Sequence, residues 1–99
     1  MRIIYMSDYK ITKYSFDKAK ELNLTIKVSK NPLKKLDVYT NNGVFLGNIG
    51  DSRYNDFPHY CIIYNKKYAE TRKLLYKNRH KKNSDVKYSK QWLALNLLW

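Results

Sequence analysis

Residues 36–49 read LDVYTNNGVFLGNI, and this stretch decides the fold. Two strand-like runs flank Asn42-Gly43, a pair that tolerates the positive φ angles of a tight turn, so the stretch predicts a β-hairpin. Upstream, residues 24–28 alternate apolar and polar side chains as a half-buried strand does, and Asn31-Pro32 ends that pattern. The runs together predict a small antiparallel sheet that contains the hairpin.

A short helix is predicted ahead of the sheet, over residues 15–23. Ser15 is the expected N-cap, Asp17 is favourable in a first turn, and Asn23 is able to end the helix.

A polar loop over residues 50–56 follows the hairpin and leads to a predicted helix. Phe57-Pro58 can open that helix because proline is tolerated in a first turn. Residues 59–64 are compatible with helix or strand, and we favour helix. Asp56 is positioned to cap it.

Residues 66–82 have a strong helical pattern. At 100° per residue the segment has two different faces. One side gathers Tyr68, Ala69, Arg72, Leu75, Tyr76 and Arg79, and another gathers Lys66, Lys73, Lys77, His80 and Lys81. Residues 83–85 are expected to end the helix.

The last segment predicts one more helix, with Tyr88, Trp92, Leu95 and Trp99 at positions i, i+4, i+7 and i+11. An apolar helix of this kind docks on the sheet to complete a small core, which is the favoured interpretation, or it buries Trp92, Leu95 and Trp99 in a partner or a second copy.

The predicted fold class is therefore α+β: a small antiparallel sheet with a central hairpin, packed by C-terminal helices. A chain of 99 residues is sized for a single domain. Within it we expect an N-terminal segment with a short helix (1–23), strands (24–50) and a basic helical part (51–99).

The composition is strongly basic, with a formal net charge of +12 and a pI near 9.8. Residues 1–50 hold 9 basic and 4 acidic side chains, and residues 51–99 hold 11 and 4. A body this small repels itself unless a polyanion or an acidic protein lies nearby, so a charged partner is expected.

Other features limit the compartment. A single cysteine excludes an intramolecular disulfide and fits a reducing environment. Residues 1–6 are too short for the apolar core of a signal peptide, and no uncharged stretch approaches the ~20 residues that span a bilayer. The sequence predicts a protein that is neither secreted nor membrane-bound.

The segment from Tyr64 to Lys82 carries eight Lys and Arg side chains against one acid, Glu70. A solvated helix surface usually mixes signs, so this excess favours contact with phosphates. The residues expected to make that contact are Lys66, Lys73, Lys77, Lys81 and His80, with Arg53 and Lys82 beside them.

Two arginines, Arg72 and Arg79, fall instead among the aromatic side chains of the helix. Either their stems lie on the apolar surface while the guanidinium groups reach acids such as Asp51 or Asp56, or rings and guanidinium groups form a platform for bases. We favour the structural interpretation because aromatic side chains on an apolar helix face are usually core.

Catalysis has little support in the sequence. Asp51, Asp56, His59 and His80 are able in principle to bind a divalent ion or activate water for phosphodiester cleavage, yet no catalytic motif accompanies them. We expect no catalytic residue, no metal site and no cofactor, and a metal-dependent nuclease is the least favoured function.

Several short blocks resemble small basic proteins encoded by nucleocytoplasmic large DNA viruses, a family of unknown activity. The blocks run in order from Leu36 to Trp99: Leu36-Asp37-Val38-Tyr39, Asn48-Ile49-Gly50-Asp51, Tyr54-x-Asp56-Phe57-Pro58, Tyr68-Ala69-Glu70-x-Arg72, Leu75-Tyr76-x-x-Arg79-His80-x-Lys82 and Leu97-Leu98-Trp99. The resemblance implies a viral setting, in the virion or in the cytoplasm or nucleus of an infected cell, and transfers no catalytic residue.

The sequence thus predicts a protein that binds DNA or RNA through phosphates with little sequence preference, in genome packaging or virion structure. The alternative is a minor capsid or scaffold-like component whose partners are acidic virion proteins or further copies of itself. DNA versus RNA, single versus double strand, and the oligomeric state stay open.

Overall fold

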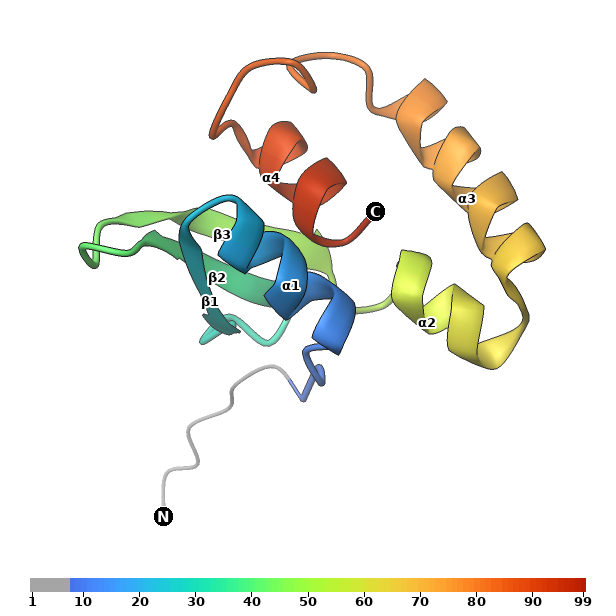
Figure 1. Cartoon of the computed structure of the whole chain (residues 1–99), viewed down its shortest axis with the longest axis horizontal. Helices are drawn as coiled ribbons and strands as arrows, with labels where there is room; N and C mark the ends of the chain where they lie inside the picture. The colour runs from blue at the N-terminus through green and yellow to red at the C-terminus, as the bar shows by residue number, and fades with distance from the viewer. Residues whose placement is uncertain (1–7) are drawn as a thin grey trace. The chain divides into compact units, whose positions relative to one another are not determined.

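The computed structural model describes residues 8–99 and contains both helices and strands, as the α+β prediction requires (Figure 1). Its elements are α1 (Lys13–Glu21), β1 (Leu24–Val28), β2 (Lys34–Thr40), β3 (Phe45–Asp51), α2 (Phe57–Ile63), α3 (Lys66–Arg79) and α4 (Lys90–Leu97). Three helices thus follow the sheet. The prediction for residues 1–6 lies outside the described residues.

The chain divides into two compact units, one ending at Arg53 and the other beginning at Tyr54. The first holds α1 and the three strands, and the second holds α2, α3 and α4. Within residues 8–99, no helix combines the length and the apolar character needed to cross a membrane.

The sheet is antiparallel with the strands in chain order, β1-β2-β3. Alternate residues of β1 and β2 supply its buried face: Leu24 and Ile26 from β1, Leu36 and Val38 from β2. Ile49 of β3 pairs with Leu36 and is also buried. The period-two pattern of the sequence therefore locates this core correctly.

The predicted hairpin is confirmed, and its turn is a three-residue loop. The amide of Gly43 donates to the carbonyl of Thr40 at 2.9 Å, and that of Thr40 donates to the carbonyl of Val44 at 2.8 Å. Gly43 is the one residue of the turn with a positive φ, +88°; the φ of Asn42 is not positive, although asparagine tolerates such an angle. This is a turn followed by a left-handed glycine, a common way to close hairpins.

The first helix begins earlier than expected. Thr12 is its N-cap, and the Thr12 Oγ1 accepts a hydrogen bond from the Ser15 amide at 3.3 Å. The Ser15 prediction was therefore wrong: Ser15 lies inside the helix and is fully buried. Asn23 has a φ of +57° directly after the helix, which is the left-handed geometry that ends helices.

The second unit begins as predicted. Asp56 caps α2 by accepting from the His59 amide at 3.2 Å, and the expected helix over residues 59–64 runs to Ile63. Asn65 caps α3 in the same manner, accepting from the Tyr68 amide at 2.8 Å.

The end of α3 and the start of α4 differ from the prediction. α3 ends at Arg79, because His80 leaves helical geometry with φ −118° and ψ 42°, so Lys81 and Lys82 lie beyond the helix. The last helix starts after Ser89, and Tyr88 has a φ of +67°, so the expected stripe from Tyr88 through Trp99 does not share one helical register. The buried side chains there are Leu93, Ala94, Leu97, Leu98 and Trp99.

Replacing Gly43 with alanine should lower the free energy of unfolding by about 1 kcal/mol, because a Cβ is strained at this φ. No heavy atom lies within 4 Å of the Cβ position, so the cost comes from the backbone alone. Urea denaturation measures the loss, with Asn42→Ala as the matched control. Equal stabilities of the two variants would contradict the role of Gly43.

Candidate nucleic-acid interface

An aromatic cluster holds the second unit together. The ring of Trp99 stacks on that of Tyr76 with centroids 4.5 Å apart and an interplanar angle of 15°, and its centroid lies 6.1 Å from that of Tyr60. Next to it, the Phe57 amide donates to the Leu98 carbonyl at 3.1 Å. Trp99 is only 8% exposed. The residues after α4 are therefore tied to α2 and α3 by packing and by a backbone hydrogen bond.

Trp92, Leu95 and Trp99, the predicted docking residues, have different environments. Trp99 is buried within this cluster, and the rings it contacts come from α2 and α3. Trp92 and Leu95 are half-buried, and the Trp92 ring meets the Tyr88 ring edge-on at 5.5 Å. Trp99 is therefore not available as an anchor for a partner unless the cluster opens.

The two arginines of α3, Arg72 and Arg79, have different environments. The Cζ of Arg72 lies 5.4 Å from the centre of the Tyr60 ring, and its Nε is buried without a hydrogen-bond partner. Arg72 thus packs on the aromatic cluster through a cation–π contact, as the structural interpretation proposed, but among the described residues it forms no ion pair with Asp51 or Asp56 as that interpretation also expected. Arg79 is exposed, and so is Leu75, which had been predicted on the apolar side. The buried face of α3 is narrower than predicted and centres on Ala69.

The lysines predicted on one side of the helix have different environments. Lys66 and Lys77 are exposed on α3, and Lys81 is exposed beyond its end. Lys73 is half-buried, with its Nζ 5.3 Å from the centre of the Phe57 ring. Lys66, Lys73, Lys77 and Lys81 were expected to project together from one helix face. The structure differs at two of them: the Lys73 ammonium lies over the Phe57 ring of α2, and Lys81 lies beyond the end of α3.

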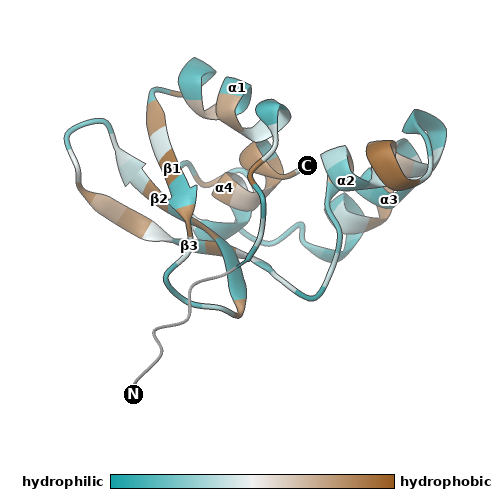
Figure 2. Cartoon of the chain, turned by 90° about the horizontal axis from the view of Figure 1, so that it is seen from below, coloured by the Kyte–Doolittle hydropathy of each residue, from teal (hydrophilic) through white to brown (hydrophobic). Residues whose placement is uncertain are grey.

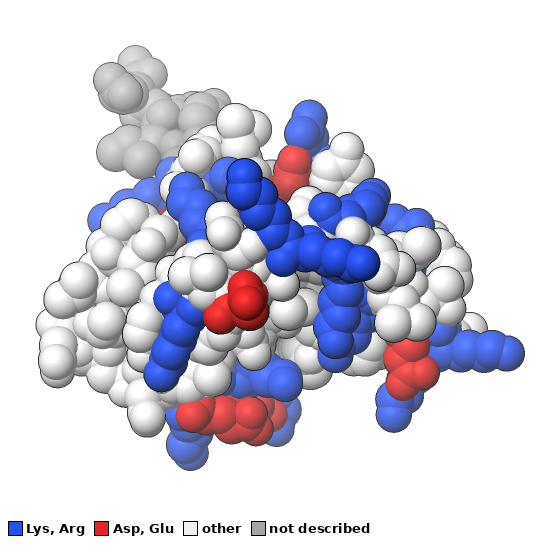
Figure 3. Space-filling model, turned by 90° about the horizontal axis from the view of Figure 1, so that it is seen from above, with Lys and Arg blue, Asp and Glu red and all other residues white. Residues whose placement is uncertain are grey.

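Five lysines of this region are exposed, and we call them the α3 lysine set: Lys66, Lys67, Lys77, Lys81 and Lys82. Within residues 8–99 no carboxylate forms an ion pair with any of them, the described pairs lying at Lys13, Arg53 and His59. Figure 3 shows how far basic side chains spread over one face of the molecule, with acidic ones between them.

The start of α3 concentrates positive charge. Lys66 and Lys67 occupy the first turn, which contains no acidic residue. The amide groups of a helix N-terminus already carry a partial positive charge, so lysines there are unfavourable for the isolated helix. An anion at this end would relieve that repulsion.

His80 does not add to the charge at neutral pH. Its ring stacks on Tyr76 with centroids 4.3 Å apart. Burial lowers the pKa of the His80 imidazole below its ordinary value of 6.5, and the positive charge of Arg79 acts in the same direction. Burial also raises the pKa of the Tyr76 hydroxyl, while Arg79 opposes that shift. His80 is thus an aromatic packing residue, in contrast to its predicted role as a cation.

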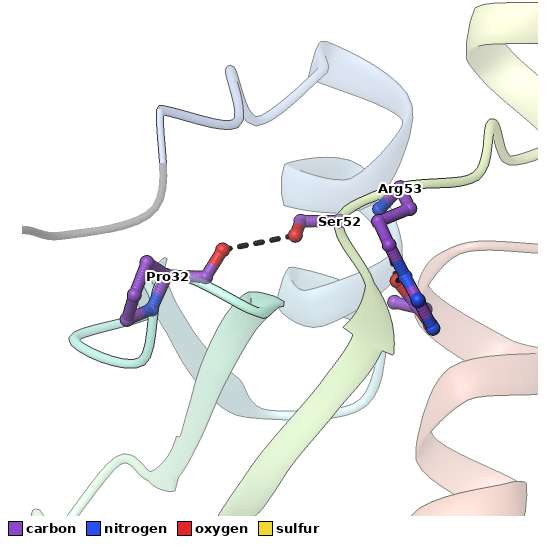
Figure 4. A network of polar contacts seen from close by, with 4 residues as sticks. Pro32, Ser52 and Arg53 are labelled. Atoms are coloured by element: carbon purple, nitrogen blue, oxygen red, sulfur yellow. Dashed lines mark hydrogen bonds and ion pairs between the residues drawn. The ribbon is translucent and has the colours of Figure 1, made fainter.

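Arg53 lies in the other unit and is already paired. Its guanidinium forms a two-pronged contact with Asp51, Nε to Oδ1 at 3.0 Å and a terminal nitrogen to Oδ2 at 2.7 Å. These hydrogen bonds, the backbone amide of Arg53 and its charge hold the pKa of Asp51 well below its usual range. The Ser52 hydroxyl, next to Arg53 in the chain, donates to the Pro32 carbonyl at 2.9 Å (Figure 4). A phosphate would have to compete with Asp51 for Arg53.

The carboxylates and histidines weighed for catalysis do not converge. The Nδ1 of His59 lies 2.7 Å from the Oδ1 of Asp56, which is fully buried as the cap of α2. Asp51 binds Arg53, and His80 stacks on Tyr76. Among the residues that the structure describes, no three His, Cys, Asp or Glu side chains come together in a way that holds a metal ion.

Sequence reasoning missed the exposed rings at the turn between α2 and α3. Tyr64 is 57% exposed and was given no role, and Tyr68 is 39% exposed although the helical pattern had placed it on the buried side. It also missed apolar side chains in water on both helices, Ile62, Ile63, Leu74 and Leu75. Figure 2 shows the hydrophobic band on α3. The pairs Ile62-Ile63 and Leu74-Leu75 were the available signal, because adjacent helix residues point in different directions and a narrow buried face does not cover both.

Acid should weaken the second unit through His80. Because the folded state binds the His80 proton less tightly than the unfolded chain, the stabilisation is intact above the ordinary pKa of 6.5 and is lost as the pH falls below it. Urea denaturation followed by tryptophan fluorescence, from about pH 7.5 down to about pH 5, measures the effect. His80→Gln should flatten this decline, and an unchanged decline would contradict the assignment.

Comparison with known proteins gives no relative: no family model, curated protein or solved structure matches this chain.

Proposed function

We propose that this protein binds DNA or RNA through the phosphate backbone, with little sequence preference, and that it acts in genome packaging or virion structure. The observation that carries the proposal is the α3 lysine set, five exposed lysines without an ion-pair partner in the described part of the chain. The second unit holds 10 basic and 3 acidic side chains, so this charge is not balanced nearby in the sequence.

Phosphate contact accounts for this charge better than solubility does. A few unpaired charges keep a small protein soluble, whereas a net charge of +12 on 99 residues adds self-repulsion that opposes folding. Nucleic acid removes the repulsion, and each neutralised phosphate releases a condensed counterion, which favours binding entropically. The gathering of Lys66 and Lys67 at the positive end of α3 is costly for a free protein and useful to an anion-binding one.

The expected absence of sequence preference follows from the residue types. Lysine presents a compact charge on a flexible stem, which suits phosphates, whereas base edges are usually identified by rigid two-pronged groups such as the arginine guanidinium. Arg72 lies over Tyr60, and Arg53 is paired with Asp51. The viral setting rests on the resemblance of the sequence blocks described above.

Salt titration of binding to duplex DNA tests the proposal. Five phosphate contacts predict a slope of about −4.5 for log K against log salt concentration, and Lys66→Ala, Lys77→Ala or Lys81→Ala should each reduce its magnitude by about 0.9. Lys13→Ala is the matched control, because the Nζ of Lys13 is already paired with Asp17 at 2.8 Å. An affinity that barely changes with salt would falsify the proposal.

A second candidate is a minor capsid or scaffold-like protein that binds other proteins, including copies of itself. The observation that favours it is the exposure of large apolar side chains on α2 and α3: Ile62 is 75% exposed and Leu74 is 63% exposed. Exposed apolar side chains of this size commonly mark contact surfaces when they lie together.

Size measurement separates this second candidate from the first. If the protein is a structural component, it should form an oligomer by size-exclusion chromatography with light scattering, and Ile62→Ser should shift it toward the monomer, since Ile62 is exposed and dispensable for folding. Thr71→Ala, an exposed change on α3, is the control. A monomer that binds nucleic acid rejects the second candidate.

A further inference from the structure

Two tyrosine rings form an exposed pair at the turn between α2 and α3. Tyr64 is the residue that follows α2, and Tyr68 is the third residue of α3. Their ring centroids are 4.5 Å apart, with an interplanar angle of 36°. More than half of Tyr64 and more than a third of Tyr68 nevertheless remain in contact with water. The pair is packed against itself without being covered.

The pair rests on a buried base. The ring of Tyr68 meets that of Tyr60 edge-on at 5.6 Å, and the ring of Tyr64 lies 6.1 Å from it. Tyr60 is buried, with the guanidinium carbon of Arg72 at 5.4 Å from its ring centre and Trp99 at 6.1 Å. These contacts restrict the rotation of the exposed rings, so a ligand that stacks on them loses less side-chain entropy than it would on free tyrosines.

Positive charge lies directly beside the rings. Lys66 and Lys67 are exposed and lie between the two tyrosines in the sequence, and the first turn of α3 has no acid. Residues one and two positions apart on a helix point in different directions, so Lys66 and Lys67 flank Tyr68 without sharing its face; their long flexible stems let the ammonium groups reach phosphates that adjoin a base stacked on Tyr68. Rings with cations beside them are the arrangement that single-stranded nucleic acid requires.

We propose that Tyr64 and Tyr68 form a stacking site for unpaired nucleobases, with Lys66 and Lys67 on the adjoining phosphates. This inference rests on the proposed function and makes it more specific: the preferred ligand is single-stranded nucleic acid. In a duplex the faces of the bases are covered by their neighbours, so the tyrosine pair gains nothing from it, whereas a single strand exposes those faces.

The site would be tolerant of sequence. Every base has a π-face, and stacking on tyrosine depends weakly on which base supplies it. The α3 lysine set would bind single and double strands alike through their phosphates, so the preference for single strands must come from the two rings. This division of roles makes the inference separable from the proposed function.

Fluorescence anisotropy with a labelled oligonucleotide of about 15 nucleotides, alone or annealed to its complement, tests the division. The single strand should bind more tightly. Tyr64→Ala and Tyr68→Ala should each weaken single-strand binding about tenfold while duplex affinity and the salt slope stay unchanged. Tyr68→Phe keeps the ring and should keep the affinity, which separates stacking from any contribution of the hydroxyl.

Leu74→Ala is the matched control, because it removes an exposed apolar side chain from the same helix without touching the tyrosine pair. Thermal unfolding checks that each variant folds, and Tyr64, the more exposed ring, keeps the test valid if Tyr68→Ala is unstable. Unchanged single-strand affinity in folded Tyr64→Ala, or equal losses for both ligands, overturns the inference while lysine variants still report on the proposed function. No binding to either ligand overturns both.

Discussion

The second unit depends on the stacking of Trp99 against Tyr76. This contact joins a residue beyond α4 to the C-terminal part of α3, and Tyr60 of α2 lies on the edge of the same cluster. α2 has seven residues, a length at which an isolated helix is unstable in water. α3 has few buried side chains of its own. Both helices therefore need the aromatic cluster, and the exposed rings and lysines of their turn are positioned by it.

A consequence of this arrangement is that charge and core are separated on α3. Ala69, Arg72 and Tyr76 pack inward, while Lys66 and Lys77 remain in water. Glu70 lies near the two lysines in the helical repeat, yet forms no ion pair with either within the described residues. The positive surface is therefore a property of the folded helix as well as of the composition. Aromatic packing on the other side of α3 offsets the repulsion between its lysines.

Much of the fold was predictable because local rules decided it. The strand at Leu24–Val28, the hairpin around Gly43 and the cap at Asp56 each depend on residues close in sequence. The start of α1 was missed because Thr12 and Ser15 are both good caps, and only the burial of Ser15 decides between them. The end of α3 was missed because His80 leaves helical geometry at a point where the basic, helix-compatible sequence carries no stop signal.

The candidate site was predictable in residue type more than in geometry. Charge patterning identified Lys66, Lys77 and Lys81, which are indeed exposed. It did not predict that Lys73 would lie over Phe57, since that contact joins two helices. Nor did it identify the exposed tyrosines, because a helical projection ranks a residue by angle and does not include how far a short neighbouring helix covers it.

The strand order β1-β2-β3 follows the chain, and this has a kinetic meaning. Each strand pairs with its immediate neighbour in sequence, so the sheet requires only short loops to close and belongs to the class of topologies that form quickly. The ring of Trp99, in contrast, must find Tyr60 across most of the second unit. During synthesis the meander can assemble before residue 99 has been added, whereas the aromatic cluster requires that residue, so α2 and α3 settle later than the sheet.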